Sequence, residues 1–239
     1  MQRLLFLCLV GLLVASAALA EDFWTSKEYM QWTDEEVKKV MTNSPWAKDI
    51  TITIPAAALG RGGQRAEGPA PSDVESGGGG GGRGRRGSGG GGGEGASPSE
   101  ASIALTLSFR SALPVRKALI RSRLGSGAAV PPEAALLISK EPEEYVVVVT
   151  GLPAALAPLV DPILKDKSTI RAGKKPPMAA KGMDVQRRTQ SVDVFYTFAK
   201  TQIISADDKE LEIDLRIGPI EAKKKFNLKD MVYNGKLEL

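Results

Sequence analysis

The sequence predicts an α+β fold: a mixed sheet with a C-terminal antiparallel meander, interrupted by a disordered glycine-rich insertion. A capping box near residue 33 opens a helix, apolar residues alternate with charged ones after residue 191, and glycine runs separate these two parts. Helices and strands follow one another without the strict alternation that a parallel sheet needs, so the α+β class is favoured.

The first twenty residues have the order of a secretory signal peptide. Arg3 supplies a positive charge, an apolar run follows from Leu4 to Val14, and Ala18-Leu19-Ala20 offers small residues for cleavage. The apolar run is too short to span a membrane, which takes about 20 apolar residues. We therefore expect residues 1–20 to be removed and the mature chain to be exported, to a periplasm or into the medium, without a transmembrane segment.

Loss of the signal peptide changes the chemistry that is open to the chain. Cys8 is the only cysteine and the sequence has no histidine. Disulfides, thiolate nucleophiles, histidine-dependent triads and the usual zinc, copper and haem ligand sets are therefore excluded, and we expect no cofactor. The 32 Lys and Arg fall to 31 when Arg3 leaves, against 28 Asp and Glu, a formal charge of +3. So small a charge argues against a specific nucleic-acid partner.

The mature chain divides into three parts. Residues 21–56 are expected to form the N-terminal helix and strand of the folded unit, residues 57–98 a disordered Gly/Arg-rich insertion, and residues 99–239 the main α+β domain. The insertion holds the glycine runs 77–82 and 89–93 and almost no large apolar side chain. It cannot bury enough surface to offset the entropy of ordering, and its ends can meet at one place in a single domain.

The N-terminal part begins with a clear helix signal. Thr33-Asp34-Glu35-Glu36 is a capping box and predicts a helix from about Asp34 to Met41. Isoleucines then alternate with threonines over residues 50–54, the pattern of a half-buried strand. Aromatic side chains gather at binding surfaces or in cores. We interpret the three tryptophans as core residues: Trp24, Trp32 and Trp46.

The main body is expected to run strand, helix, helix, strand, helix and loop. These elements are predicted at residues 103–109, 114–125, 132–138, 145–150, 153–164 and 166–190, in that order. The β-branched run within 145–150 is typical of a strand buried on both faces. Residues 166–190 are basic and contain prolines, which indicates a long loop.

The C-terminal region predicts antiparallel strands, the first over residues 192–198. A two-residue turn at Gly218-Pro219 would place opposite charges on one face of a hairpin and apolar groups on the other. The expected pairs are Glu212–Lys225, Asp214–Lys223, Leu211–Phe226 and Leu215–Ala222. Asn234-Gly235 predicts a type I′ turn between the last two strands.

The acidic stretch 207–212 is the first candidate for chemistry. Asp207, Asp208 and Glu210 are weak candidates for holding a divalent cation, and acids of this stretch are candidates for an acid/base pair. The spacing lacks the EF-hand pattern, and a turn followed by the solvated face of a strand explains the same residues. We therefore assign no catalytic, cofactor-binding or metal residue from the sequence.

Basic residues form the second candidate. Arg83, Arg85 and Arg86 in the insertion, with residues 165–188, would give weak contact to anionic envelope polymers. No aromatic residues interleave with these arginines, so single-stranded nucleic acid has no stacking platform there.

Four segments resemble an uncharacterised family of exported bacterial proteins. They are WTDEEV at 32–37, NSPWAK at 43–48, SALPVR at 111–116 and FNLKDMVYNGKLEL at 226–239. The resemblance covers both expected folded parts and skips the glycine-rich segment. It implies one folded unit with a variable insertion, and it implies no activity.

The leading hypothesis is an exported, non-enzymatic binding or interaction protein, associated with the cell envelope, whose partner is an unknown envelope or extracellular protein. It rests on the missing catalytic residue types and on the lack of a nucleotide or metal motif. A carboxylate-dependent hydrolase and a polyanion-tethering protein remain the alternatives.

Overall fold

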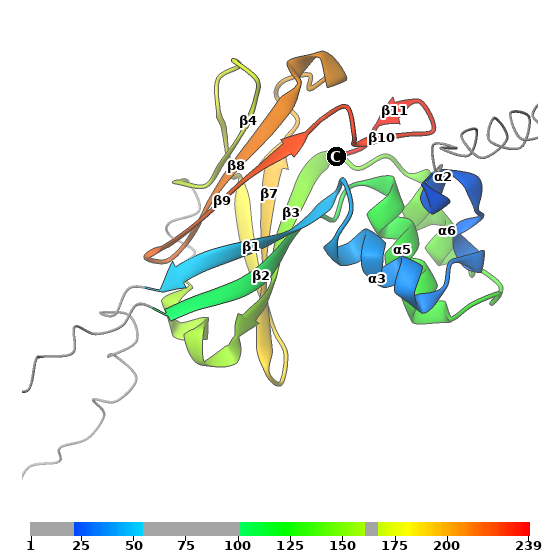
Figure 1. The fold of residues 1–239 in the computed structure, drawn as a ribbon, viewed down its shortest axis with the longest axis horizontal. Helices are drawn as coiled ribbons and strands as arrows, with labels where there is room; N and C mark the ends of the chain where they lie inside the picture. Colours follow the sequence, from blue (N-terminus) through cyan, green and yellow to red (C-terminus); the bar gives the residue numbers. More distant parts are fainter. Residues whose placement is uncertain (1–21, 55–100, 161–166) are drawn as a thin grey trace, which may run out of the picture.

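The computed structural model describes residues 22–54, 101–160 and 167–239 (Figure 1). The expected signal peptide, residues 1–20, and the whole of the expected glycine-rich insertion, residues 57–98, lie outside these residues. The described chain is α+β, as predicted: two antiparallel sheets face each other, and a group of short helices packs at one end.

The larger sheet has the strand order β1-β2-β3-β7-β6. Its strands are β1 (Ala47–Ile54), β2 (Ala101–Phe109), β3 (Glu144–Pro153), β7 (Ser191–Ala199) and β6 (Gly182–Arg187). β1 and β2 pair along their whole length, so the chain on the two sides of residues 55–100 is joined by a continuous ladder. β3 lies in the middle, and its Val147 and Val148 on opposite faces are both fully buried, which confirms the predicted central strand.

The smaller sheet has the order β5-β4-β8-β9. Its strands are β5 (Met178–Ala179), β4 (Thr169–Ala172), β8 (Glu210–Ile217) and β9 (Ile220–Asn227). The turn Gly218-Pro219 joins β8 to β9 in the predicted register, with Asp214 opposite Lys223 and Leu211 opposite Phe226. A separate hairpin pairs β10 (Val232–Tyr233) with β11 (Lys236–Leu237). Asn234 and Gly235 both have positive φ, as the predicted type I′ turn requires.

Two expectations for the middle of the chain are wrong. Residues 166–190 do not form a long loop, because β4, β5 and β6 lie there. β5 and β6 are edge strands, where polar sequence is common, and β4 has only four residues, so the alternating pattern is weak in all three. The described part of the helix expected at 153–164 is a 3₁₀ helix, η3 (Ala154–Leu159), and residues 161–164 lie outside the described residues. Pro158 lacks a backbone N–H and disfavours a longer α-helix there.

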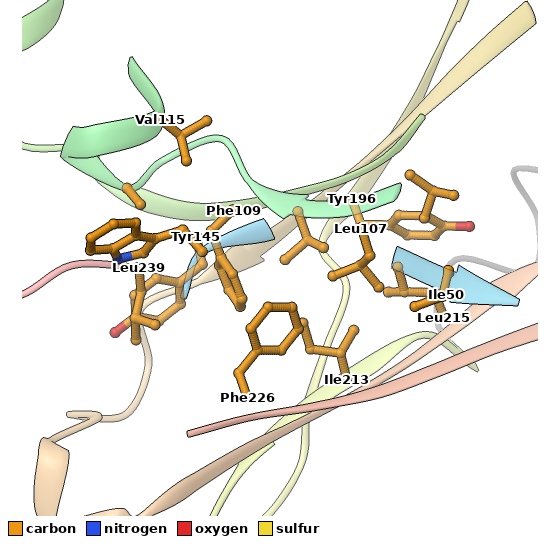
Figure 2. Close-up of a cluster of buried hydrophobic side chains, with 14 of the residues drawn as sticks. Ile50, Leu107, Phe109, Val115, Tyr145, Tyr196, Ile213, Leu215, Phe226 and Leu239 are labelled. Carbon is orange, nitrogen blue, oxygen red and sulfur yellow. The ribbon is translucent and has the colours of Figure 1, made fainter. Parts of the chain in front are cut away.

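The core lies between the two sheets (Figure 2). Phe109 of β2 and Phe226 of β9 meet edge to face, with ring centroids 5.3 Å apart. Ile213 and Leu215 of β8 are fully buried on the same side of the smaller sheet. The Tyr196 hydroxyl of β7 donates to the Arg216 carbonyl at 2.7 Å, so a hydrogen bond also joins the two layers.

The helices follow local signals in the sequence. They are α2 (Phe23–Ser26), η1 (Tyr29–Gln31), α3 (Asp34–Thr42), α5 (Leu113–Leu124), α6 (Pro132–Ser139) and η5 (Ala206–Asp208). The predicted capping box of α3 forms, because the Glu36 amide donates to the Thr33 hydroxyl and the Thr33 amide donates to the Glu36 carboxylate. Within the described ranges, no helix is long and apolar enough to cross a membrane.

The three tryptophans are core residues, as predicted: Trp24, Trp32 and Trp46 are all buried. The Trp46 ring lies 5.7 Å from the Trp24 ring and 6.2 Å from the Tyr233 ring. Its indole N–H donates to the Met231 carbonyl at 3.3 Å. Trp46 therefore connects the N-terminal helices to the C-terminal hairpin.

The turn between β8 and β9 packs against Leu159 of η3, and this contact can be tested. Gly218 has φ +59°, and a Cβ there would overlap the Leu159 carbonyl oxygen, whereas Gly235 has φ +77° with open space around it. We expect Gly218→Ala to lower the free energy of unfolding by about 2–4 kcal/mol, since strain and overlap add, and Gly235→Ala by about 1 kcal/mol from strain alone. Urea denaturation of both variants measures this, and equal losses would contradict the packing of η3 against the turn.

Candidate functional site

A cavity of about 400 Å³ opens where the helices meet the C-terminal segment. The start of α5, the connection from α6 to β3, the segment after β7 and the last residues of the chain all contribute to it. It is lined by Leu113, Arg116, Ile138, Ser139, Lys140, Glu141, Pro142, Tyr145, Lys200, Gln202, Ile203, Ile204, Lys236, Leu237, Glu238 and Leu239. Figure 2 shows Tyr145 and Leu239, two of these residues, at the edge of the core.

Arg116 of α5 holds the end of α6 beside the cavity. Its Nη1 donates to the carbonyl oxygens of Leu137 at 2.6 Å and Lys140 at 2.8 Å, and a longer contact reaches Ile138. The last carbonyls of a helix have no partner inside the helix, so a guanidinium that points at them completes the terminus. Burial lowers the pKa of Arg116, while Glu238 and Glu141 oppose that shift.

Glu238 plays the matching part at the start of α5. The N-cap residue of α5 is Ala112, which has no side-chain oxygen. The Glu238 carboxylate instead accepts a hydrogen bond from the Leu113 amide at 3.1 Å, and Glu238 is only 9% exposed. A carboxylate at this end also meets the positive end of the helix dipole. The C-terminal segment thereby forms one wall of the cavity and caps a helix that lies far away in sequence.

Cations outnumber carboxylates in the lining. Arg116, Lys140, Lys200 and Lys236 stand against Glu141 and Glu238. The Glu141 carboxylate lies 3.1 Å from Lys236 Nζ and 3.9 Å from Lys200 Nζ. The hydrogen bond from Lys236 is the largest cause that lowers the pKa of Glu141, and the charges of Lys236, Lys200 and Arg116 add to it.

Tyr145 provides an aromatic wall for these charges. Lys200 Nζ lies 5.1 Å from the centre of its ring, a cation–π distance. Burial raises the pKa of the Tyr145 hydroxyl, and the nearby charge of Glu141 raises it further. The Tyr145 hydroxyl is therefore neutral at physiological pH, and the role of the ring is to orient Lys200.

Exposed apolar side chains surround the cavity. Leu136 and Leu137 of α6 are 67% and 61% exposed, and Ile203 at the cavity is 86% exposed. None of the residues of α6 is buried. A second, shallower hollow is lined by Leu136, Leu137 and Val146 and shares Arg116, Lys140, Glu141 and Pro142 with the cavity, so the two form one continuous surface. We call this the α6 surface.

The acids predicted from the sequence do not line the cavity. Two of them, Asp208 and Glu210, each pair with a different lysine. Asp208 ends η5, accepts from the Ser205 amide at 2.9 Å and pairs with Lys175 at 2.6 Å. Glu210 begins β8 and pairs with Lys225 across the hairpin at 3.3 Å. Asp207 lies exposed in η5. Within the described part of the chain, no three Asp or Glu residues come together as a metal site.

The remaining acids of the hairpin form a ladder of charge pairs. Glu212 pairs with Arg171, and Asp214 pairs with Lys223 at 3.3 Å. The hydrogen bond from Lys175 lowers the pKa of Asp208, and the one from Arg171 lowers the pKa of Glu212. A general acid near neutral pH needs a raised pKa, so this arrangement suits cross-strand pairing better than proton transfer.

Within the described part of the basic stretch, residues 167–188, four of the seven basic side chains have an acidic partner. Arg171 pairs with Glu212, Lys175 with Asp208, Lys181 with Glu144 and Arg188 with Asp193. These pairs reduce the free positive charge that a polyanion would meet. The arginines at 83–86 lie outside the described residues.

Sequence reasoning missed the cavity because its residues are scattered along the chain. One signal pointed towards it: two segments of the family resemblance, 111–116 and 226–239, contribute Leu113, Arg116 and the C-terminal wall. Comparisons of the chain with protein-family models, with curated proteins and with solved structures find no match. The functional argument therefore rests on the geometry of the site.

The contact between Arg116 and α6 predicts a local change in one variant. The Nζ of a lysine lies closer to its own backbone than an arginine Nη1, so Arg116→Lys should lengthen these contacts and loosen α6 while the sheets stay folded. Loss of a hydrogen bond from a charged donor costs about 1.5–3 kcal/mol, so we expect at least roughly tenfold faster amide exchange over residues 132–140. The exposed Arg123→Lys is the matched control in hydrogen-exchange mass spectrometry. Unchanged exchange in Arg116→Lys would contradict the role of this contact.

The Asp208–Lys175 pair predicts a pH dependence. In the folded protein the pKa of Asp208 is lowered from its usual value of 3.8. The pair therefore stabilises the fold above pH 3.8, and this stabilisation is lost as the pH falls through the folded pKa. Asp208→Asn should therefore lower the unfolding free energy by about 0.5–1 kcal/mol at pH 7 and make little difference near pH 2. Chemical denaturation at both pH values checks this, with exposed Asp207→Asn as control. A loss of equal size at both pH values would show that charge is not the cause.

Proposed function

We propose that the protein is an exported binding protein without a catalytic role, and that its α6 surface binds a polypeptide segment of an envelope or extracellular partner. One observation carries the proposal. The large hydrophobic side chains that the described residues expose lie on one surface: Ile203 lines the cation-rich cavity, and Leu136 and Leu137 line the hollow that adjoins it.

The exposure of these side chains costs free energy that a partner would recover. Full burial of a leucine or isoleucine is worth about 1.5–3 kcal/mol relative to exposure in water. Leu136 and Leu137 are neighbours on a helix with no buried residue of its own, so nothing in their helix explains their apolar character. Clustered exposed apolar groups with a polar rim are typical of interaction sites.

The charge of the cavity indicates the chemistry of the partner. Four basic side chains and two carboxylates line it, and Glu238 is already occupied by the Leu113 amide. A partner with an acidic side chain beside apolar ones would match both parts of the surface. A polypeptide fits better than a small molecule because the apolar side chains extend from the cavity over the adjoining hollow.

The paired acids of the β8–β9 hairpin support binding over hydrolysis. Glu210, Glu212 and Asp214 each face a basic residue across the sheet, and the pKa of Glu212 is lowered. A carboxyl group with a lowered pKa, such as Glu212, does not provide the proton donor that a carboxylate-dependent hydrolase requires.

Site-specific photo-crosslinking tests the proposal. Benzoylphenylalanine placed at Leu137 or at Ile203, in the full chain expressed in its native host, should give an adduct with the same partner protein. The exposed Thr51 on β1 is the control position and should give no such adduct. Adducts of equal yield at all three positions, or none at Leu137 and Ile203, would overturn the assignment of the α6 surface.

A further inference from the structure

We propose that Glu141 occupies the place of a ligand carboxylate, and that the cavity binds an acidic side chain of the partner, flanked by apolar residues, between Lys200 and Lys236. The inference rests on the proposed function, since it names the group that the partner presents to the α6 surface.

The geometry of the two lysines carries the inference. Lys200 follows β7 and Lys236 begins β11, yet both ammonium groups point at one carboxylate of Glu141, at 3.9 and 3.1 Å. Lys200 is held against the Tyr145 ring, and its side chain is 28% exposed. Lys200 is therefore positioned by packing before a ligand arrives, and Lys236, whose side chain is 60% exposed, is brought to the same place by the β10–β11 hairpin.

Glu141 is a weak occupant of this site. Its side chain is 67% exposed and belongs to the short connection between α6 and β3. Exposed ion pairs contribute little because water and salt screen them. Glu141 also lacks an apolar group that would stay in the cavity, so its carboxylate can turn into solvent when another acid takes its place.

A partner acid with apolar neighbours gains more from the same position. Leu113, Ile138, Ile204 and Leu237 line the cavity around the charges. A ligand that places a carboxylate on Lys200 and Lys236 therefore buries adjacent apolar side chains at the same time. Burial also strengthens each ion pair, because water is displaced from around it.

The Glu141 carboxylate then competes with the partner's carboxylate for Lys200 and Lys236 and so lowers the affinity for the partner. Replacement of Glu141 by glutamine removes the internal carboxylate while keeping the shape of the side chain. Glu35 on α3 is the control, since it is exposed and lies outside the residues that line the cavity and the adjoining hollow. The two substitutions change the net charge equally, so a difference between them reports on the position of the carboxylate rather than on the general field.

The test uses the mature full chain and defined peptide probes in isothermal titration calorimetry. The probes are acetyl-Leu-Leu-Glu-Leu-amide, its Gln analogue with an amide end, and the Gln analogue with a free C-terminus. We expect the Glu peptide to bind at least roughly tenfold more tightly than the Gln amide. The third probe distinguishes a terminal carboxylate from a side-chain one as the source of the acid.

The variants give the decisive comparison. Glu141→Gln should tighten binding of the Glu peptide by roughly fivefold, and Glu35→Gln by less than twofold. Lys200→Gln and Lys236→Gln should each weaken it by roughly tenfold, with exposed Lys38→Gln on α3 as control. Thermal melting of each variant verifies that it is folded.

Two results would overturn the inference. Equal tightening by Glu141→Gln and Glu35→Gln would show that the effect comes from overall charge. Equal binding of the Glu and Gln amides would show that the carboxylate is not recognised. Either result, together with persistent crosslinks at Leu137 and Ile203, would leave the interaction role intact. Absence of crosslinks at Leu137 and Ile203 would instead contradict the proposed function itself.

Discussion

The burial of Trp46 is the contact on which the arrangement of the helices and the C-terminal segment depends. Its ring packs between Trp24 and Tyr233, and its indole N–H donates to the Met231 carbonyl. These residues come from the two ends of the described chain. Because an interior packs densely and its polar groups need partners, one buried tryptophan with a satisfied N–H fixes both segments against the start of β1.

The cavity follows from that arrangement. Once the C-terminal segment is held, Glu238 reaches the start of α5, and α5 in turn directs Arg116 at the end of α6. Both contacts satisfy helix ends that have no local cap: α5 begins after an alanine, and α6 has no glycine at its end. Long-range polar contacts thus replace local caps, and the space that they surround becomes the cavity.

Charge is used differently in two parts of the molecule. On the β8–β9 hairpin, acids and bases face each other across the strands and cancel, which suits a solvated sheet face. In the cavity, basic residues outnumber acids and lie beside exposed leucines. The balanced surface supports the fold, and the unbalanced one supports the proposed recognition of an acidic, apolar segment.

Much of the fold could be predicted from the sequence because its signals are local. The capping box at 33–36, the alternation along β8 and the Asn234-Gly235 turn each specify backbone geometry within a few residues. A two-residue turn also determines the register of its strands, and therefore which side chains face the core. The same local logic was insufficient for β4, β5 and β6. β4 has four residues and pairs with β8, which is distant in sequence, and β5 and β6 are edge strands whose polar sequence shows little alternation.

By itself, then, the sequence determined the fold class, the core role of the tryptophans, the limits of the main helices and the charge pairing of the C-terminal hairpin. Only the tertiary structure decided that Arg116 meets α6, that Glu238 caps α5 and that Lys200 and Lys236 converge on Glu141. No sequence pattern around a single arginine, lysine or glutamate predicts which distant residue it will contact. Its contact depends on where packing of the intervening chain places it, and that is a property of the whole fold.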